Sequence, residues 1–215
     1  MLIGLQHRFI FVANTKSAST AIESALRPHA EIHHGGTPAR KHIALRCALK
    51  EYADLFARPG MEAEKFFKFG VMREPIDWIG SWFRYRKRKD ARNSLPPAMS
   101  FAEFWARGDW NVTRRDGRRN LQREKFTAAD GTVLADVILP YHGLAEQFPV
   151  LCAHLGMRAA LARHNVSPKP AATVEIPPPL REELHAFYAE DYALFERLDE
   201  INAAGMARLA TRVER

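Results

Sequence analysis

The sequence predicts one three-layer α/β/α domain over residues 1–215, with a mostly parallel central sheet. Short apolar runs rich in aromatic and β-branched residues, such as FIFVA and FFKFGVM, alternate with longer segments of helical periodicity. This alternation is typical of parallel strands joined by helical crossovers. The chain has 215 residues, which is enough for one such domain with a sizeable core and too few for two.

The N-terminal half contains the first two predicted strands. Residues 9–13 are rich in residues that favour a buried strand, and Ile22, Ala25 and Leu26 recur at helical spacing after them. The other expected elements of this half are a loop over 28–40, a helix over 41–56, a strand over 66–72 and a helix that begins at Pro75 and ends in basic residues 84–92.

The C-terminal half contains a third predicted strand and most of the remaining helices. Ser100 and Glu103 predict a capping box, because each side chain can bond the backbone N–H of the other residue. Asp130 and Gly131 predict a turn before a strand, and Gly156 predicts a helix end. The expected elements are an extended segment over 121–126, a strand over 133–139, a helix over 144–155, a proline-rich loop over 164–179 and two or three helices over 180–213.

The chain is basic, with a net charge of +7 and a pI of about 9.6. A basic protein attracts anionic partners, but charge alone does not separate nucleic acid from a phosphorylated cofactor or a sulfated sugar. No apolar run reaches the length of a membrane span, and the N-terminus is expected to lead straight into the first strand. Cys47 and Cys152 lie in apolar helical contexts, which predicts buried free thiols. These features favour a cytoplasmic protein with no membrane partner.

The segment between the first strand and the first helix predicts a phosphate-binding turn. Its sequence NTKSAST contains small and polar residues and one lysine, Lys16. Backbone N–H groups and the helix dipole attract an anion there, and small side chains let the anion approach. The glycines of G-x-x-x-x-G-K-[ST] are missing, so an ordinary ATP-binding loop is not expected. The alternative is a helix start capped by Ser17 or Ser19, with Lys16 in solvent.

A second motif follows the second predicted strand. Arg73 ends that strand, Pro75 opens the next helix, and Ser81 stands about two turns into it. Parallel strands bring their carboxyl ends to one edge of the sheet, where ligands bind. We therefore expect Arg73 and Ser81 to hold a second phosphate near the Lys16 loop.

These two motifs resemble those of the sulfotransferases that use 3′-phosphoadenosine 5′-phosphosulfate (PAPS). The segment TKSASTA, residues 15–21, resembles the family's 5′-phosphosulfate loop. Arg73, Pro75, Ser81 and Phe83 match its R-x-P-x-x-x-x-x-S-x-[YF] signature for the 3′-phosphate. The resemblance implies a P-loop-like sulfotransferase fold.

Three later segments extend the resemblance over most of the chain. VILPYHGL, residues 137–144, resembles a family strand, and Asn165 stands where many members have an asparagine. YAEDYALF, residues 188–195, resembles a terminal segment of Golgi-type and bacterial carbohydrate sulfotransferases. The chain departs from the family where Ala18 and Ser19 replace loop glycines, and where Pro140 and His142 replace the usual arginine and glutamate.

The resemblance implies transfer of a sulfuryl group from PAPS to a hydroxyl or amine of an acceptor, such as a carbohydrate or another small metabolite. Lys16 would act catalytically by stabilising the leaving phosphate. No metal is implied, and the sequence holds no cluster with metal-ligand spacing. The implied nucleotide-binding residues are Thr15, Lys16, Ser17, Ala18, Ser19, Thr20, Ala21, Arg73 and Ser81.

The general base is expected to be His42, which stands in a Lys-His context between the two motifs, as in many members of the family. Histidine suits proton transfer near neutral pH. The alternative for His42 is a helix-start histidine bonded to a neighbour. His33 and His34 are open alternatives as the base. Weaker candidates are Glu23, Glu74 and His142.

Two other classes of function fit parts of the sequence. A P-loop-like nucleotide kinase or phosphotransferase would need ATP and Mg²⁺, and the missing loop glycine argues against it. A non-catalytic polyanion-binding module would use the basic run over residues 84–89, which a solvated helix end explains as well. Residues 84–89 and 114–123 are also expected to border a cleft for an acidic or sulfated acceptor. Lys169 is a further residue that would reach the nucleotide.

Overall fold

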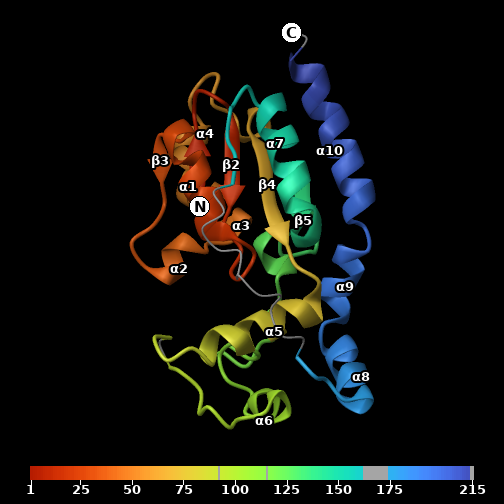
Figure 1. Cartoon of the computed structure of the whole chain (residues 1–215). Coiled ribbons are helices and arrows are strands. Elements are labelled where there is room, and N and C mark those ends of the chain that lie inside the picture. The colour runs from red at the N-terminus through yellow and green to blue at the C-terminus, as the bar shows by residue number, and fades with distance from the viewer. Residues whose placement is uncertain (92, 115, 162–173, 214–215) are drawn as a thin grey trace.

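In the computed structural model, a five-stranded sheet carries helices on both faces (Figure 1). The structure describes residues 1–91, 93–114, 116–161 and 174–213. The strands are β1 (Leu2–Gly4), β2 (Phe9–Val12), β3 (Ile32–His33), β4 (Phe67–Met72) and β5 (Val137–Pro140). The helices are α1 (Ser19–Leu26), α2 (Pro38–Lys41), α3 (Leu45–Glu51), α4 (Ala53–Phe56), α5 (Pro75–Arg86), α6 (Phe101–Ala106), α7 (Leu144–His154), α8 (Pro178–Phe187), α9 (Ala189–Phe195) and α10 (Leu198–Val213). Short 3-10 turns are η1 (Arg27–His29), η2 (Ala63–Lys65), η3 (Arg123–Lys125) and η4 (Tyr141–Gly143).

The sheet has the order β3-β1-β2-β4-β5 and is mixed. β4 pairs parallel with both β2 and β5, whereas β1 pairs antiparallel with β2 and β3. The prediction of an α/β fold is confirmed, but the sheet is only partly parallel. The difference arises because residues 2–4 fold back on β2 as a hairpin instead of leading straight into it. In the parallel part, Val12 aligns with Gly70 and Met72 with Pro140, so three carboxyl ends meet at one edge.

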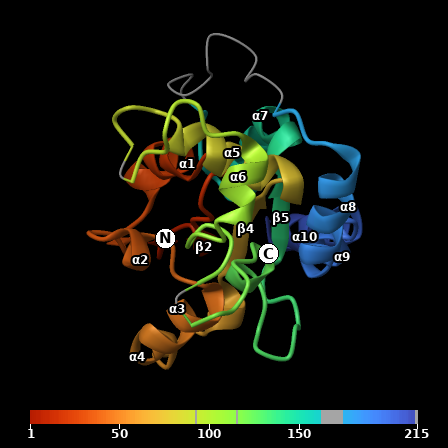
Figure 2. The same cartoon turned by 90° about the horizontal axis from the view of Figure 1, so that it is seen from below.

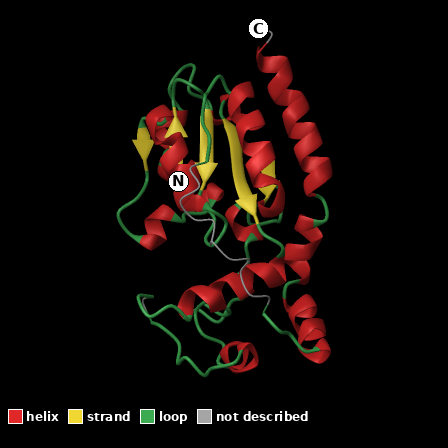
Figure 3. Cartoon of the chain, viewed as in Figure 1, coloured by secondary structure: helices red, strands yellow, loops and turns green. Residues whose placement is uncertain are grey.

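The two faces of the sheet bury separate hydrophobic clusters. On one face, α1 and α7 pack over alternate residues of β2, β4 and β5. On the other face, α3 and the α9–α10 region cover the intervening residues. This burial of both faces explains why the strands of the sequence read as continuous apolar runs. Figure 3 shows the strands between these helices.

The outer edge of β5 is closed by a side chain of α10. Asn202 accepts a hydrogen bond from the Ile138 N–H at 2.8 Å and donates one to the Ile138 carbonyl at 2.9 Å. An edge strand otherwise presents unpaired backbone groups that invite pairing with another chain. α10 therefore ends the sheet at this side, and Figure 1 shows it running beside β5.

Beyond the carboxyl edge of the sheet lie α5, α6 and α8 (Figures 1 and 2). The side chains between these helices form an aromatic core. Arg86 is buried at its border, where it donates to the Asn93 carbonyl, Asp109 and Asn111. The large buried side chains of this core include Trp78, Trp82, Phe101, Phe104, Trp105 and Tyr188. This layer lies against the sheet edge at which the three carboxyl ends meet.

Several expected elements differ in detail from the observed ones. The helix expected over 41–56 is split into α3 and α4 by a break at Tyr52 and starts only at Leu45, while the loop expected over 28–40 contains β3 and most of α2. The extended segment expected over 121–126 contains the 3-10 turn η3, and only the end of 133–139 forms β5. The capping box of Ser100 and Glu103 is confirmed, as are three C-terminal helices.

Two further observations bear on the general character of the chain. Within the described residues, no helix combines the length and apolarity that a bilayer crossing requires. Cys152 is buried and free, as expected, whereas the prediction of a buried Cys47 is wrong. Cys47 lies on the outward side of α3, whose buried positions are Leu45 and Ala48.

Candidate functional site

The loop that joins β2 to α1 has an unusual backbone. Residues 15–18 form a turn in which Lys16 and Ala18 both have φ near +57°, in the left-handed region. α1 then begins at Ser19, and no side chain among the described residues caps it. The first backbone N–H groups of any helix have no partner within the helix, and here they have no side-chain cap either. A turn of this kind before an uncapped helix is a general anion-binding geometry.

The hydroxyl of Ser17 does not serve as a helix cap. It accepts a hydrogen bond from Asn14 Nδ2 at 3.2 Å and donates to the Thr15 carbonyl at 3.3 Å. Trp78 Nε1 also donates to that carbonyl, at 2.8 Å. The alternative in which α1 is a helix capped by Ser17 or Ser19 is therefore wrong, and these bonds hold the turn instead.

The ammonium group of Lys16 lies over aromatic rings of α5 and not in open solvent. Its Nζ is 4.0 Å from the centre of the Tyr85 ring and 5.5 Å from that of Trp82. Burial and, to a smaller extent, the positive charges of Arg73, Arg88 and Arg84 together lower the pKa of Lys16 to about 8. The positive charge of a half-buried lysine among other cations is not balanced by its surroundings. A bound anion would therefore stabilise the charged form of Lys16.

Arg73 lies beside the same loop. Its Nη1 donates to the Lys16 carbonyl at 3.3 Å, its guanidinium stacks 4.1 Å from the Tyr141 ring centre, and its Nε bonds Asp77. Burial alone would raise the pKa of Asp77, but the hydrogen bonds and charges of Arg73 and Arg84 lower it. The structure therefore brings together Lys16 and Arg73, which the sequence places 57 residues apart.

Ser81 lies on the face of α5 that contacts the loop. It stands three residues after Trp78, which bonds the loop, and four before Tyr85, which lies beneath Lys16. Residues three and four apart share one face of a helix. Ser81 therefore stands between two residues of α5 that contact the loop, and its pairing with Arg73 stays a prediction.

Two buried amides connect the loop to the end of β4. Asn14 and Gln122 are 2% and 1% exposed, and Asn14 Nδ2 donates to Gln122 Oε1 at 2.9 Å. Gln122 also accepts from the Arg73 N–H at 3.1 Å and donates to the Arg73 carbonyl at 2.8 Å. A Cβ at Gly70 would lie 2.5 Å from the Phe126 ring, so this glycine lets the 121–126 segment close against β4. No local pattern of the sequence predicts this bridge, because its members are far apart along the chain.

The bridge is held in turn by a buried carboxylate on α9. Asp191 is fully buried and accepts hydrogen bonds from the N–H groups of Gln122 and Arg123 at 3.0 and 2.8 Å. Burial raises the pKa of Asp191 to about 7, against the effect of these two hydrogen bonds. Asp191 thus connects the C-terminal helices to both halves of the site. The sequence signal that could have identified Asp191 is its place in the segment over 188–195, which resembles a sulfotransferase segment.

His42 lies at the carboxyl end of β2. Its Nδ1 is 2.7 Å from the Ala13 carbonyl, and because a carbonyl only accepts, Nδ1 carries the proton and Nε2 the lone pair. Burial, together with the charges of Lys125 and Lys41, lowers the pKa of His42 to about 4, although the hydrogen bond to Ala13 opposes this shift. Lys125 also bonds the His42 carbonyl. His42 is therefore a neutral, oriented imidazole next to the loop.

The other histidines proposed as a base are engaged elsewhere. His33, in strand β3, is 2.7 Å from the Ala30 carbonyl. His34 is buried, and its Nδ1 lies 2.9 Å from the Tyr52 hydroxyl. Burial lowers the pKa of His34. Neither contact is with the Lys16 loop, so among these histidines the geometry favours His42.

The weaker candidates for the base also have structural contacts. Glu74 caps α5 by accepting from the Asp77 N–H at 2.6 Å, and Glu23 pairs with Lys41 at 2.7 Å. Lys41 Nζ also donates to the Thr20 hydroxyl at 3.3 Å, which leaves the proton of that hydroxyl free of this bond. His142 is exposed in η4. Asn165 and Lys169 lie outside the described residues.

The basic run at the end of α5 is largely used within the fold. Arg84 pairs with Asp77, Arg86 is buried, and Arg88 pairs with Asp90. Lys87 donates to backbone carbonyls of the following loop, including that of Met99 at 2.9 Å. These contacts account for most of the run without a nucleic-acid partner.

No group of three or more potential metal ligands occurs in the part of the chain that the structure describes. Comparisons of the chain with protein-family models, with curated proteins and with solved structures found no match. The geometry of the site is therefore the basis for the function proposed below.

Proposed function

We propose that this protein is a PAPS-dependent sulfotransferase with a P-loop-like fold, which transfers a sulfuryl group to a hydroxyl or amine of a small acceptor such as a carbohydrate. The observation that carries this proposal is the contact between two cationic features at one sheet edge. One is the uncapped loop with Lys16, and the other is Arg73, which donates to the Lys16 carbonyl. Two adjacent anion sites suit a nucleotide with a 5′-phosphosulfate and a separate 3′-phosphate.

The donors present fit such a nucleotide. The first turn of α1 offers N–H groups of residues 19–21, and Ala18 and Ser19 are small enough for close approach. Arg73 and Ser81 would hold the 3′-phosphate, with the Arg73 guanidinium oriented by Asp77. When bound, PAPS would supply the activated sulfuryl group.

Lys16 and His42 would carry the chemistry that the chain itself contributes. With a pKa of about 8, Lys16 is mostly charged at pH 7, and its flexible side chain can exchange the Tyr85 ring for a phosphate oxygen on which charge develops. His42 would accept the acceptor's proton at Nε2, since Nδ1 is bonded to Ala13. The low pKa of His42 keeps this nitrogen unprotonated at neutral pH.

Thermal-shift titration separates this proposal from the kinase and the polyanion-binding module. Adenosine 3′,5′-bisphosphate should raise the melting temperature, because a ligand that binds only the folded state stabilises it. ATP with Mg²⁺ should have no comparable effect. Stabilisation by ATP–Mg²⁺ alone would favour a kinase, and a response to neither nucleotide would favour the binding module.

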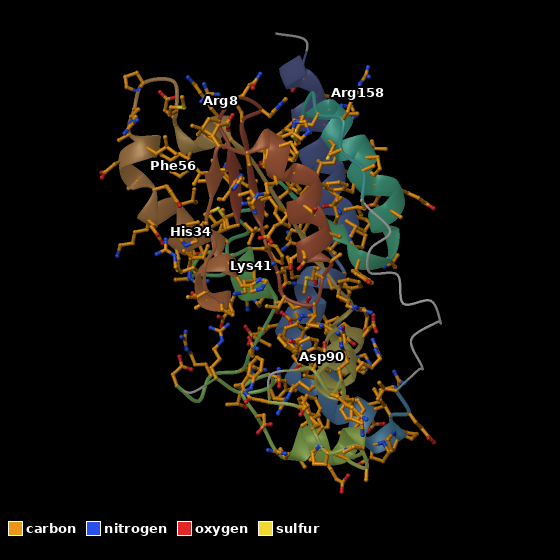
Figure 4. All side chains as sticks on the ribbon, turned by 60° about the vertical axis from the view of Figure 1, so that its left-hand side comes forward. Arg8, His34, Lys41, Phe56, Asp90 and Arg158 are labelled. Carbon is orange, nitrogen blue, oxygen red and sulfur yellow. The ribbon has the colours of Figure 1, made fainter. Side chains whose placement is uncertain are left out.

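Catalysis is tested by transfer of labelled sulfate from PAPS to a panel of sugars, lipids and small alcohols. Lys16→Ala should abolish transfer, whereas Arg73→Ala should chiefly weaken nucleotide binding. The exposed Arg158, which Figure 4 labels near the upper end of the molecule and away from Lys41 and Asp90, supplies the control Arg158→Ala. Full activity of Lys16→Ala would contradict the mechanism.

A further inference from the structure

A second cationic site lies on the other side of the segment that holds Gln122. It is a pocket of about 490 Å³ between α3, the 117–129 region and α9. The side chains of Gln122 and Lys125 point from this segment to Asn14, Arg73 and His42. Other residues of the same region line the pocket; they include Leu121, Arg123, Glu124 and Thr127.

The lining of this pocket carries more positive than negative charge. It contains four arginines (Arg46, Arg118, Arg119 and Arg123) and two glutamates (Glu124 and Glu190). Two charged residues outside the lining also contact it: Arg114 pairs with Glu124, and Asp116 pairs with Arg118. The charges of Arg114 and Asp116 are opposite, so together they do not change the net charge of the pocket. A concave surface with unbalanced guanidinium groups concentrates anions.

The arginines are held in place but remain accessible to a ligand. Arg119 and Arg123 both bond the carboxylate of Glu190. Arg46 Nη1 donates to the carbonyls of Glu124 and Thr127 at 2.9 and 3.2 Å. The side chains of Arg119 and Glu190 are 41% and 42% exposed. Ion pairs that exposed contribute little free energy, so an anionic ligand can replace Glu190 as a partner at small cost.

We propose that this pocket binds a small molecule that carries a carboxylate or a sulfate ester on a body of sugar size. Guanidinium groups recognise both anions through paired hydrogen bonds. The volume is in the range of small-molecule sites, and Leu121, Ala128 and Ala129 give one apolar wall for the body of the ligand. Because the pocket lies on the other side of this segment from Arg73 and His42, binding there goes beyond the proposed function and does not depend on it.

The test is a magnetic-resonance titration of the isotope-labelled full chain with glucuronate, glucose sulfate, glucose and inorganic sulfate, in the absence of nucleotide. The two anionic sugars should shift the backbone amides of Gly117, Ala128 and Ala129, and glucose should not. Shifts confined to the loop over 15–21 would overturn the proposal. Inorganic sulfate that binds as tightly as glucose sulfate would refute a sugar-borne ligand.

Two variants and one control complete the test. Arg119→Gln should weaken binding of the anionic sugars about tenfold, the loss expected for one charge-assisted hydrogen bond. Arg118→Gln, whose side chain is 63% exposed and pairs with Asp116, should weaken it without disturbing the fold. Arg158→Gln should bind like the wild type. Unchanged affinity in both pocket variants would overturn the assignment. Pocket binding without any nucleotide binding would refute the proposed function and leave the pocket established.

Discussion

The left-handed Ala18 allows a quantitative test of the loop geometry. With φ +57° and ψ 18°, its Cβ is placed where an L-residue is strained, at a cost of about 1–2 kcal/mol that glycine does not have. Glycine in turn stabilises the unfolded chain by about 0.4–1 kcal/mol. Ala18→Gly should therefore raise the free energy of unfolding by about 0.5–1 kcal/mol, or the melting temperature by about 2 °C for a domain of this size.

The matched control is Ala25→Gly in the same helix, where the backbone is α-helical. Glycine there should lower the free energy of unfolding by about 1 kcal/mol. Denaturant unfolding of the wild type and both variants measures the two changes under one condition. Opposite signs support the loop as described. Equal destabilisation by both substitutions would refute a left-handed Ala18, and with it the uncapped anion-binding turn.

Three further predictions test other parts of the site. Nucleotide affinity should fall as pH rises above about 8, because deprotonation of Lys16 removes the positive charge that binds the anion. Calorimetric titration between pH 6 and about 9.5 measures this fall, which should be absent in Lys16→Arg. An affinity of the wild type that does not change with pH would contradict the assignment. Asp191→Ala should lower the free energy of unfolding by about 2–4 kcal/mol, because it leaves the N–H groups of Gln122 and Arg123 without acceptors. A loss of less than about 1 kcal/mol in denaturant unfolding would contradict this role of Asp191. His42→Gln should reduce sulfate transfer with little effect on nucleotide affinity, and equal kcat in variant and wild type would exclude His42 as the base.

Local signals in the sequence were sufficient for much of the fold. Apolar runs located β2, β4 and β5, and the capping box of Ser100 and Glu103 marked the start of α6. The hairpin of β1 escaped prediction because three residues carry too little periodicity to mark a strand. The break after Lys41 escaped it because the apolar spacing continues across the break, while Lys125 and Ala13 hold His42 from distant parts of the chain.

The site was predictable only in outline. The meeting of Lys16 and Arg73 follows from the position of each residue after a parallel strand. The bridge through Asn14, Gln122 and Asp191 does not follow from any local pattern, since it depends on how the 121–126 segment closes over Gly70. Tertiary packing also decides that Lys16 lies over an aromatic ring rather than in solvent.

The central claim is that the Lys16 loop and Arg73 together bind one nucleotide through two separate phosphates. The most direct measurement is a comparison, by calorimetry, of the affinities for adenosine 3′,5′-bisphosphate and adenosine 5′-monophosphate in the wild type and in Arg73→Ala. We expect the wild type to bind the bisphosphate at least about tenfold more tightly, and Arg73→Ala to lose this preference. Equal affinities for the two nucleotides in the wild type would contradict the claim.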